Sequence, residues 1–433
     1  MPHKRVLLIA NEFPPLWGGG VPRPFAFARY LAQQGWDVTV LTLQPEYYDM
    51  SLGQDLDKLA LLPASVTIVR TKALRPKANV VSSEKKPANN APVITKQSFF
   101  ARFKSSLRGL FIIPDKEITW YLPAVKAGKK ILKQADFDII WSSSPQISTH
   151  IIGAKLQKKF NLPWVADFRD PVPLVENSSK PRDLIRNYFL KKTLKSVFKR
   201  ASHIVSVATR IQEQLQKYAG TFDKFTVIEN GYDPADFEDL PTVTLKPDVI
   251  NMTYVGSLFG KRATPEILAG LTQALEQLNK SKPRVHLHLV GPIAPVFQAR
   301  FQARSDVTLH GPQNHKRALA FMKQGDLNIL LATTQVQDSY PGKLFEYLAA
   351  GKPIILLVKP KSLLSEFCKK YQLGAEANPK NTNEISKALV KAVLDWDAGV
   401  RELAHADLKE RFNRQKQTVR LIGIFDSLMK NDA

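Results

Sequence analysis

Short apolar runs rich in β-branched residues alternate along the chain with longer amphipathic stretches, and this alternation is compatible with few folds. Strands are predicted at residues 6–10, 38–43, 66–70, 138–142, 164–168, 204–207, 226–229, 251–255, 285–290, 307–310, 327–331 and 353–358. Helical patterns fill most of the intervals, for example at 24–34 and 264–278. Because nearly all-apolar strands need cover on both faces, the pattern predicts an α/β protein with doubly wound parallel sheets.

Residues 237–247 interrupt the alternation, because they contain two prolines and have no apolar periodicity. We interpret this stretch as an interdomain linker. The expected organisation is an N-terminal Rossmann-like domain over 1–237, a linker over 238–249 and a C-terminal Rossmann-like domain over 250–433. The final helix of the C-terminal domain is a candidate for crossing back to the N-terminal domain. Ligands of doubly wound sheets bind beyond the carboxyl ends of strands, which predicts a cleft faced by both domains.

The composition excludes several classes of protein. Apolar residues make up 44% of the 433 residues, enough for a sizeable core, which excludes a disordered chain. No apolar run approaches the roughly 18 residues needed to span a bilayer, and the run at 6–10 is too short for a secretion signal. The single cysteine, Cys368, excludes an internal disulfide and a CxxC zinc site. We therefore expect a cytoplasmic protein.

The chain carries a net charge of +23, and most of the excess lies in its first half. Residues 1–200 hold 32 Lys and Arg against 15 Asp and Glu, whereas residues 201–433 hold 30 against 24. A basic half indicates an anionic partner, either nucleic acid, a membrane surface or a phosphorylated substrate. A solvated surface without a partner is the alternative for any single lysine.

Two basic segments stand out in this half. A basic insert is expected over about 75–113, where 75–92 has the composition of a mobile loop. It is followed by apolar residues at helical spacing with cations between them, namely Phe99, Phe103, Leu107 and Leu110 with Arg102, Lys104 and Arg108. Such a helix either lies in an anionic membrane interface or packs on the domain core. In the second segment, 180–217, Leu184, Tyr188 and Leu194 are candidates for a buried stripe, and an ordinary surface helix is favoured over a membrane-binding one.

Three short motifs have the character of an anion-binding site. Gly18-Gly19-Gly20 follows the first predicted strand and allows close approach of backbone N–H groups to a phosphate or sugar, although it is neither a GxGxxG fingerprint nor a P-loop. Tyr254-Val-Gly256-Ser opens the second half and is followed by Lys261 and Arg262, a cation pair suited to a pyrophosphate leaving group. A plain turn and a surface pair are the respective alternatives.

The third motif is the run from Asp338 to Pro353, in which Pro341-Gly342 precedes a helical pattern that Gly351 ends. The start of that helix offers N–H groups to a phosphate. Glu346 follows within the first two turns, where its carboxylate can accept hydrogen bonds from a ribose diol.

No metal or separate cofactor is expected. Asp-x-Asp pairs occur at 55/57, 136/138 and 395/397, and their recurrence at unrelated places makes the pattern uninformative. His286 and His288 share one face of a predicted strand but lack a third nearby ligand, so we interpret them as structural.

These runs carry a resemblance. Residues 344–354, LFEYLAAGKPI, resemble the donor-site helix of the retaining family-four glycosyltransferases of GT-B fold, and the EX7E motif of that family maps to Asp338 and Glu346. VIENGYD at 227–233, NEFPP at 11–15 and WVADFRDP at 164–171 resemble further segments of the family. Ser257 stands where the family usually has Arg, and Arg169 where it usually has His.

The resemblance implies a retaining transferase that moves a sugar from a nucleotide-activated donor to a glycan or lipid-linked acceptor, without a metal. It implies Lys261, Arg262, Arg169 and Asp338 as catalytic residues. It implies a donor-binding set of Gly19, Gly20, Gly256, Gly342, Lys343, Leu344 and Glu346. Together with the basic first half, it predicts peripheral binding to an anionic membrane on its cytoplasmic face.

Three other functions remain open from the sequence. A sugar-nucleotide epimerase of the same fold would need carboxylate and histidine acid–base groups. A protein that binds a nucleotide sugar without transferring it is compatible with the same motifs. A nucleic-acid-binding protein would account for the charge, but no recognised nucleic-acid module is present.

Overall fold

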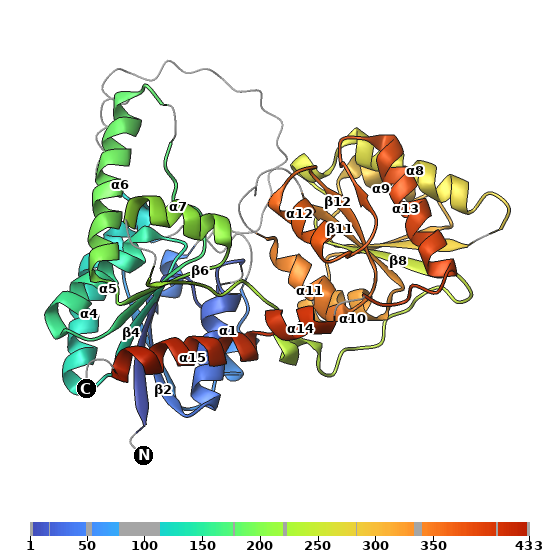
Figure 1. The fold of residues 1–433 in the computed structure, drawn as a ribbon. Helices are drawn as coiled ribbons and strands as arrows, with labels where there is room; N and C mark the ends of the chain where they lie inside the picture. The colour runs from blue at the N-terminus through green and yellow to red at the C-terminus, as the bar shows by residue number, and fades with distance from the viewer. Residues whose placement is uncertain are drawn as a thin grey trace. The chain divides into compact units, whose positions relative to one another are not determined.

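The computed structural model describes residues 3–16, 18–48, 54–77, 113–175, 178–219, 223–282, 284–332, 340–403 and 406–430. The chain divides into two compact units (Figure 1). The N-terminal unit comprises Met1–Glu229 and Thr418–Ala433, and the C-terminal unit comprises Asn230–Gln417.

In the N-terminal unit, the described residues form a seven-stranded parallel sheet with the order β3-β2-β1-β4-β5-β6-β7. Its strands are β1 (Lys4–Ala10), β2 (Trp36–Leu43), β3 (Val66–Thr71), β4 (Ile139–Ser143), β5 (Trp164–Phe168), β6 (His203–Ser206) and β7 (Phe225–Val227). The central strands β1, β4 and β5 are buried over most or all of their length, as expected for a sheet covered on both faces.

The helices of this unit are α1 (Pro22–Gln33), α2 (Asp57–Ala60), α4 (Tyr121–Gln134), α5 (Ile147–Phe160), α6 (Pro181–Arg200) and α7 (Thr209–Ala219), with 3-10 turns η1 (Pro45–Tyr47) and η3 (Lys116–Trp120). The last helix, α15 (Arg414–Lys430), begins in the C-terminal unit and belongs to the N-terminal unit from Thr418 onward. The ring of Phe425 in α15 packs on Trp36 and Trp141, with centroid distances of 5.5 and 6.4 Å.

The C-terminal unit contains, among its described residues, a six-stranded parallel sheet with the order β10-β9-β8-β11-β12-β13. Its strands are β8 (Ile250–Val255), β9 (Val285–Val290), β10 (Val307–Gly311), β11 (Leu327–Ala332), β12 (Ile354–Val358) and β13 (Glu376–Ala377). Its helices and 3-10 turns are α8 (Pro265–Leu278), α9 (Pro295–Phe301), α10 (His315–Gln324), α11 (Gly342–Ala350), α12 (Leu363–Lys370), α13 (Thr382–Asp397), α14 (Ala406–Phe412), η4 (Pro234–Phe237) and η5 (Gly260–Arg262).

Two hydrophobic clusters cover the two faces of this sheet. One contains side chains of α8 and α13, such as Leu271 and Leu389, and the other contains side chains of α10 and α11, such as Phe321 and Phe345. The doubly wound parallel architecture predicted from the strand–helix alternation is therefore confirmed, and all twelve predicted strands are present. The two-residue β13 was not predicted, because it is too short to show a period.

The predicted buried stripe of the basic helix is wrong in its first half. Leu184 and Tyr188 of α6 are 54% and 62% exposed, and only Leu194 is buried. The helix instead buries Leu190, Leu194, Val197 and Phe198, all in its second half. The Phe99–Leu110 helix and most of the predicted insert lie outside the described residues. Within the described parts of the chain, no helix has the length and apolar character that crossing a bilayer requires.

Candidate functional site

The predicted site residues of the C-terminal unit gather at the carboxyl end of β8. The loops after β8 and β9 approach each other closely there, since Gly256 N–H donates to the Val290 carbonyl at 2.8 Å. Gly291 has a φ of 131°, and a side chain at this position would collide with the carbonyl of Gly256. The tight contact therefore requires glycine at 291, and it fixes the backbone of Gly256 at the end of the strand.

Lys343 places its ammonium group over this strand end. Its Nζ donates to the Val255 carbonyl at 2.7 Å, and a Cβ built on Gly256 would lie 3.3 Å from that Nζ. Burial of the ammonium lowers the pKa of Lys343, and the nearby charge of Arg262 lowers it further, whereas Glu346 acts in the opposite direction. The absence of a side chain at Gly256 thus lets the Lys343 ammonium and the Tyr254 hydroxyl approach the strand end closely.

Helix α11 begins at the same place. Pro341 precedes its first residue, Gly342, and the first N–H groups of a helix lack partners within it. Leu344 N–H donates to the Pro341 carbonyl at 3.0 Å. The Leu344 side chain is fully buried among the core residues, so it supports the helix from behind and does not form a wall of the site. Gly342 and Lys343 are the two exposed residues of this first turn, although the Lys343 ammonium itself lies against the Val255 carbonyl and is partly buried.

Glu346 is half-buried one turn further along α11. Its Oε1 lies 3.2 Å from Nε2 of His315, the first residue of α10. Burial acts to raise the pKa of Glu346, but the hydrogen bond and charge of His315, together with the charges of Lys343 and Arg414, lower it overall. Asp236 lies on the other side of His315, with 3.9 Å between Oδ2 and Nδ1. The Glu346 carboxylate is thereby kept ionised and oriented.

Lys261 and Arg262 occupy the exposed turn η5, a few residues after β8. The charge of Arg262 acts on both Lys343 and Tyr254, which places it near the same strand end. Asp338 lies outside the described residues. The structure therefore brings Gly256, Arg262, Gly342, Lys343 and Glu346 into one region of the C-terminal unit.

The remaining predicted site residues belong to the N-terminal unit. Arg169 follows β5 and is 8% exposed. Its guanidinium donates to the carbonyls of Gly20 at 2.6 Å, Gly19 at 3.1 Å and Ser144 at 3.0 Å. All three bonds go to backbone, so Arg169 holds the glycine turn in place. A side chain at Gly20 would also collide with the Glu12 carboxylate.

A second arginine fixes the other end of this turn. Arg23, in the first turn of α1, forms two hydrogen bonds to Asp167 of β5, at 3.0 and 2.8 Å, and one to the Glu229 carbonyl at 2.9 Å. Both side chains of the ion pair are almost fully buried. Asp167 and Arg169 are two residues apart at the end of one strand, so a single strand end anchors the glycine turn from both sides.

Sequence reasoning missed His315, Arg23 and Asp167 as parts of these arrangements. His315 follows Asn314, which caps α10, and the signal of a helix start was present in the sequence although nothing linked it to Glu346. Among the residues that the structure describes, no cluster of three or more His, Cys, Asp or Glu side chains is arranged to hold a metal ion. His286 and His288 bond to Thr308, Asn251 and His310 within the sheet.

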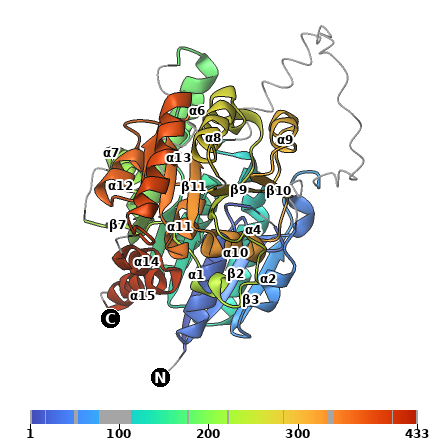
Figure 2. The same cartoon turned by 90° about the vertical axis from the view of Figure 1, so that its right-hand side faces the viewer.

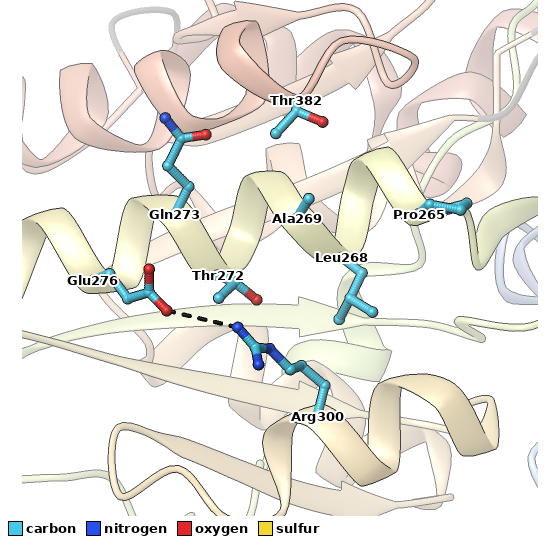
Figure 3. Close-up of a pocket in the computed structure, with 8 residues that line it drawn as sticks. All are labelled: Pro265, Leu268, Ala269, Thr272, Gln273, Glu276, Arg300 and Thr382. Atoms are coloured by element: carbon cyan, nitrogen blue, oxygen red, sulfur yellow. Dashed lines mark ion pairs between the residues drawn. The ribbon is translucent and has the colours of Figure 1, made fainter.

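A groove lies apart from these residues, on the outer side of α8 (Figure 3). It is lined by Pro265, Leu268, Ala269, Thr272, Gln273, Glu276, Arg300 and Thr382. Glu276 and Arg300 form an ion pair across it at 3.7 Å. None of the predicted site residues lines this groove.

Two family descriptions match successive parts of the chain. Residues 80–236 match Glycosyltransferase Family 4, and residues 251–395 match Glycosyl transferases group 1. No curated protein matches the chain in sequence.

Several solved structures resemble the chain over nearly its whole length. Sucrose-phosphate synthase from Thermosynechococcus elongatus is 15% identical with a TM-score of 0.61, covering 99% of this chain and 100% of its own. Anabaena Alr3699/HepE, in complex with UDP and glucose, is 14% identical with a TM-score of 0.60, covering 98% and 100%. A UDP-N-acetylglucosamine 2-epimerase described as putative, from Listeria monocytogenes, is 12% identical with a TM-score of 0.56, covering 99% and 97%. The expected GT-B fold is confirmed.

Proposed function

The chain belongs to the family-4 and group 1 glycosyltransferases, and on this premise we propose that it is a retaining enzyme that transfers a sugar from a nucleotide-activated donor to a glycan or lipid-linked acceptor. One arrangement carries the proposal. The Lys343 ammonium, the start of α11 and the ionised Glu346 carboxylate lie in sequence along one helix, beside the strand end at Gly256. Their order matches the order of phosphate and ribose in a nucleotide.

The first part of the mechanism is donor binding. Glu346 accepts hydrogen bonds from the ribose diol, with its carboxylate oriented by His315. The N–H groups of Gly342 and Lys343 and the Lys343 ammonium face the diphosphate. Gly256 lets the Lys343 ammonium lie against the end of β8, where we place the sugar phosphate. Solved structures of Anabaena Alr3699/HepE with UDP and with UDP-glucose support a uridine nucleotide as the first donor to test.

The second part is bond exchange at the anomeric carbon. The bond from this carbon to the diphosphate oxygen breaks through an oxocarbenium-like state, and a bond to the acceptor oxygen forms on the same face. The acceptor proton passes to the departing diphosphate, so no protein nucleophile is needed. Lys261 and Arg262 stabilise the negative charge that grows on the diphosphate, and Asp338 contacts the sugar hydroxyls. We keep Gly19 and Gly20 as donor-binding residues, and propose that Arg169 acts on the reaction by positioning their turn.

The third part is location. The basic N-terminal half favours an acceptor at an anionic membrane, and we propose peripheral binding on the cytoplasmic face. The stretch 99–110 is the contact that the sequence suggests.

A donor screen tests the proposal. Thermal unfolding is measured with UDP, UDP-glucose and other nucleotide sugars, since a ligand at about 100 times its Kd adds roughly 2.7 kcal/mol to the stability of the folded state. The true donor raises the unfolding temperature of the wild type and raises that of Glu346→Gln much less. Transfer to an acceptor, with the anomeric configuration followed by NMR and with metal removed by chelation, then completes the test. Inversion, or an absolute need for a divalent ion, contradicts the mechanism.

The resemblance to an epimerase structure makes epimerisation the second candidate. Incubation of the donor without acceptor separates the two. An epimerase converts the sugar of the nucleotide sugar, whereas a transferase leaves its stereochemistry intact.

A further inference from the structure

Helix α6 has an outward face that changes character along its length. In its first half, Leu184, Ile185, Tyr188 and Phe189 are 54%, 41%, 62% and 47% exposed. Large apolar side chains are seldom exposed together in this way unless something covers them. These four residues form the apolar patch discussed below.

The patch lies opposite the buried side of the helix. Helical spacing puts Leu190, Leu194, Val197 and Phe198 on one side, packed into the N-terminal unit, and puts the apolar patch on the other. The half-buried flank of the first half is already occupied, because Asn187 exchanges two hydrogen bonds with Val175, at 3.1 and 2.8 Å, and Arg186 donates to the Pro173 carbonyl at 2.9 Å. The patch is therefore not the packing surface of its own helix.

In the second half of α6 the same outward face is cationic. Lys192, Lys195 and Lys199 are exposed and continue the line of Tyr188 at helical spacing. Across Pro181–Arg200 the only acid is Asp183, which accepts a hydrogen bond from Ser178 at 2.6 Å. An apolar end followed by a row of lysines is complementary to a layer of acyl chains beneath anionic headgroups.

The position of the helix suits such a contact. In Figures 1 and 2 the N-terminal half of α6 extends past α7, away from the sheet of its own unit. A helix of 20 residues is about 30 Å long, so its tip reaches well beyond the packed half. An exposed tip can enter the interface without rearrangement of the sheet.

We propose that the apolar patch of α6 and the lysines behind it are the surface by which this protein docks on an anionic lipid membrane. The inference rests on the proposed membrane location and assigns it to α6, for which the sequence favoured an ordinary surface helix. The apolar patch inserts among the acyl chains, and Lys192, Lys195 and Lys199 bind the acidic headgroups.

Flotation with vesicles of phosphatidylcholine, with and without phosphatidylglycerol, is the first measurement. Wild type is expected to float with the anionic vesicles only. The variant Leu184→Ser/Ile185→Ser/Tyr188→Ser/Phe189→Ser should bind at least tenfold more weakly. A basic residue near an anionic surface strengthens binding about fivefold, so loss of three lysines alone weakens it on the order of a hundredfold, and Lys192→Glu/Lys195→Glu/Lys199→Glu should weaken it at least that much because each charge is also reversed.

Matched controls come from the same unit. Leu56→Ser/Leu61→Ser/Leu74→Ser/Leu122→Ser removes four similarly exposed apolar side chains, and Lys126→Glu/Lys130→Glu/Lys133→Glu makes an equal change of charge on α4. Both control variants should retain more vesicle binding than the corresponding α6 variants. Equal loss in control and α6 variants overturns the assignment, because general hydrophobicity or charge would then explain binding.

A labelled variant keeps the test independent of the multiple substitutions. Cys368 is the single cysteine of the chain and is buried, so Ile185→Cys can be labelled selectively with an environment-sensitive dye. A blue shift on anionic vesicles is expected at 185 and not at a label on Leu122→Cys. No shift at 185 while the protein floats overturns the proposal.

The outcomes separate this inference from the proposed function. If wild type floats and only Phe99→Ser/Phe103→Ser/Leu107→Ser abolishes flotation, membrane location stands and the role of α6 is wrong. If wild type does not float but binds the donor, transferase activity stands and both membrane proposals fail. A dimer in light scattering that the α6 apolar variant dissociates, with vesicle binding unchanged, shows that a second copy covers the patch.

Discussion

Nε2 of His315 lies 3.2 Å from Oε1 of Glu346, and the two residues come from the N-terminal parts of neighbouring helices, α10 and α11. A half-buried carboxylate costs free energy unless it is bonded, and His315 supplies both a bond and a direction. The donor proposal depends on this pair, since a ribose diol needs an ionised and fixed acceptor.

His315→Ala is therefore expected to weaken UDP binding by about tenfold, because a hydrogen bond to a charged group contributes about 1.5–3 kcal/mol. Glu346→Gln should weaken it at least as much, since it removes the acceptor itself. Isothermal titration calorimetry measures both. Lys316→Ala, one residue along α10, is the control and should bind as wild type. Wild-type affinity in His315→Ala would show that Glu346 does not need its partner.

The cation pair of η5 is expected to act on rate more than on binding. Lys261→Ala and Arg262→Ala should each lower kcat by about 10²–10³, as is typical for loss of one group that stabilises developing charge. Donor affinity should fall less, because charge on the diphosphate grows only in the transition state. Arg262 should matter more, since its charge already acts on Lys343. Steady-state kinetics of the double variant, with Lys280→Ala/Lys282→Ala as control, decide the assignment; unchanged turnover contradicts it.

Much of the fold was predictable because it follows from local patterns. Apolar strands such as 285–290 and the run ending at Gly351 are recognisable by composition and by helix signals alone. The position of Glu346 on its helix followed from the same run. His315 was not predictable as its partner, because the contact joins two helices that are adjacent only in the folded unit.

The contacts of α6 and of Arg169 were not predictable, for different physical reasons. Leu184 and Tyr188 have the spacing of a core stripe, but spacing cannot show that the first half of a helix extends beyond the body it packs on. Arg169 was expected in the site because of the family resemblance of the segment 164–171. Its three bonds to backbone carbonyls depend on where the turn of Gly19 and Gly20 folds, which no local pattern encodes.

Arg169→Lys tests whether this residue positions the glycine turn. Lysine keeps the charge but cannot reach three carbonyls with a planar fork. If Arg169 acts through the turn, the lysine variant should lose nearly as much activity as Arg169→Ala, and limited proteolysis should cut both near residues 18–20 faster than wild type. Arg210→Lys on α7 is the control substitution. Full activity in Arg169→Lys would instead favour a simple role for its charge.

Removing one partner of the buried pair Arg23–Asp167 is expected to destabilise the N-terminal unit more than replacing both partners by apolar residues. Asp167→Asn should lower the free energy of unfolding of the N-terminal unit by about 3–5 kcal/mol, because it leaves a buried guanidinium without its counter-charge. Arg23→Met/Asp167→Leu should recover part of this loss. Urea unfolding followed by tryptophan fluorescence measures it. Asp426→Asn breaks the exposed pair with Lys4 and should cost about 0–1 kcal/mol. Equal costs in the two aspartate variants would contradict the argument.

The buried His150 predicts how stability depends on pH. Burial lowers its pKa to about 3, against the weaker opposite effect of Asp167, whereas an unfolded histidine titrates near 6.5. Between these values the unfolded chain binds a proton that the folded unit does not, so stability is complete above pH 6.5 and falls as the pH decreases. The loss is about 1.4 kcal/mol per pH unit for this residue.

His150→Phe should remove that part of the slope. Phenylalanine can keep the ring contact with Phe168, whose centroid lies 4.2 Å from that of His150, and Ser142 retains its bond from Trp164. Urea unfolding of the wild type and the variant between pH 6.5 and 4.5 is followed by tryptophan fluorescence, which mainly reports the N-terminal unit because Trp36, Trp120, Trp141 and Trp164 belong to it. The wild type should lose about 2–3 kcal/mol more than the variant over this range. Parallel pH profiles would show that His150 takes up its proton without unfolding of the unit.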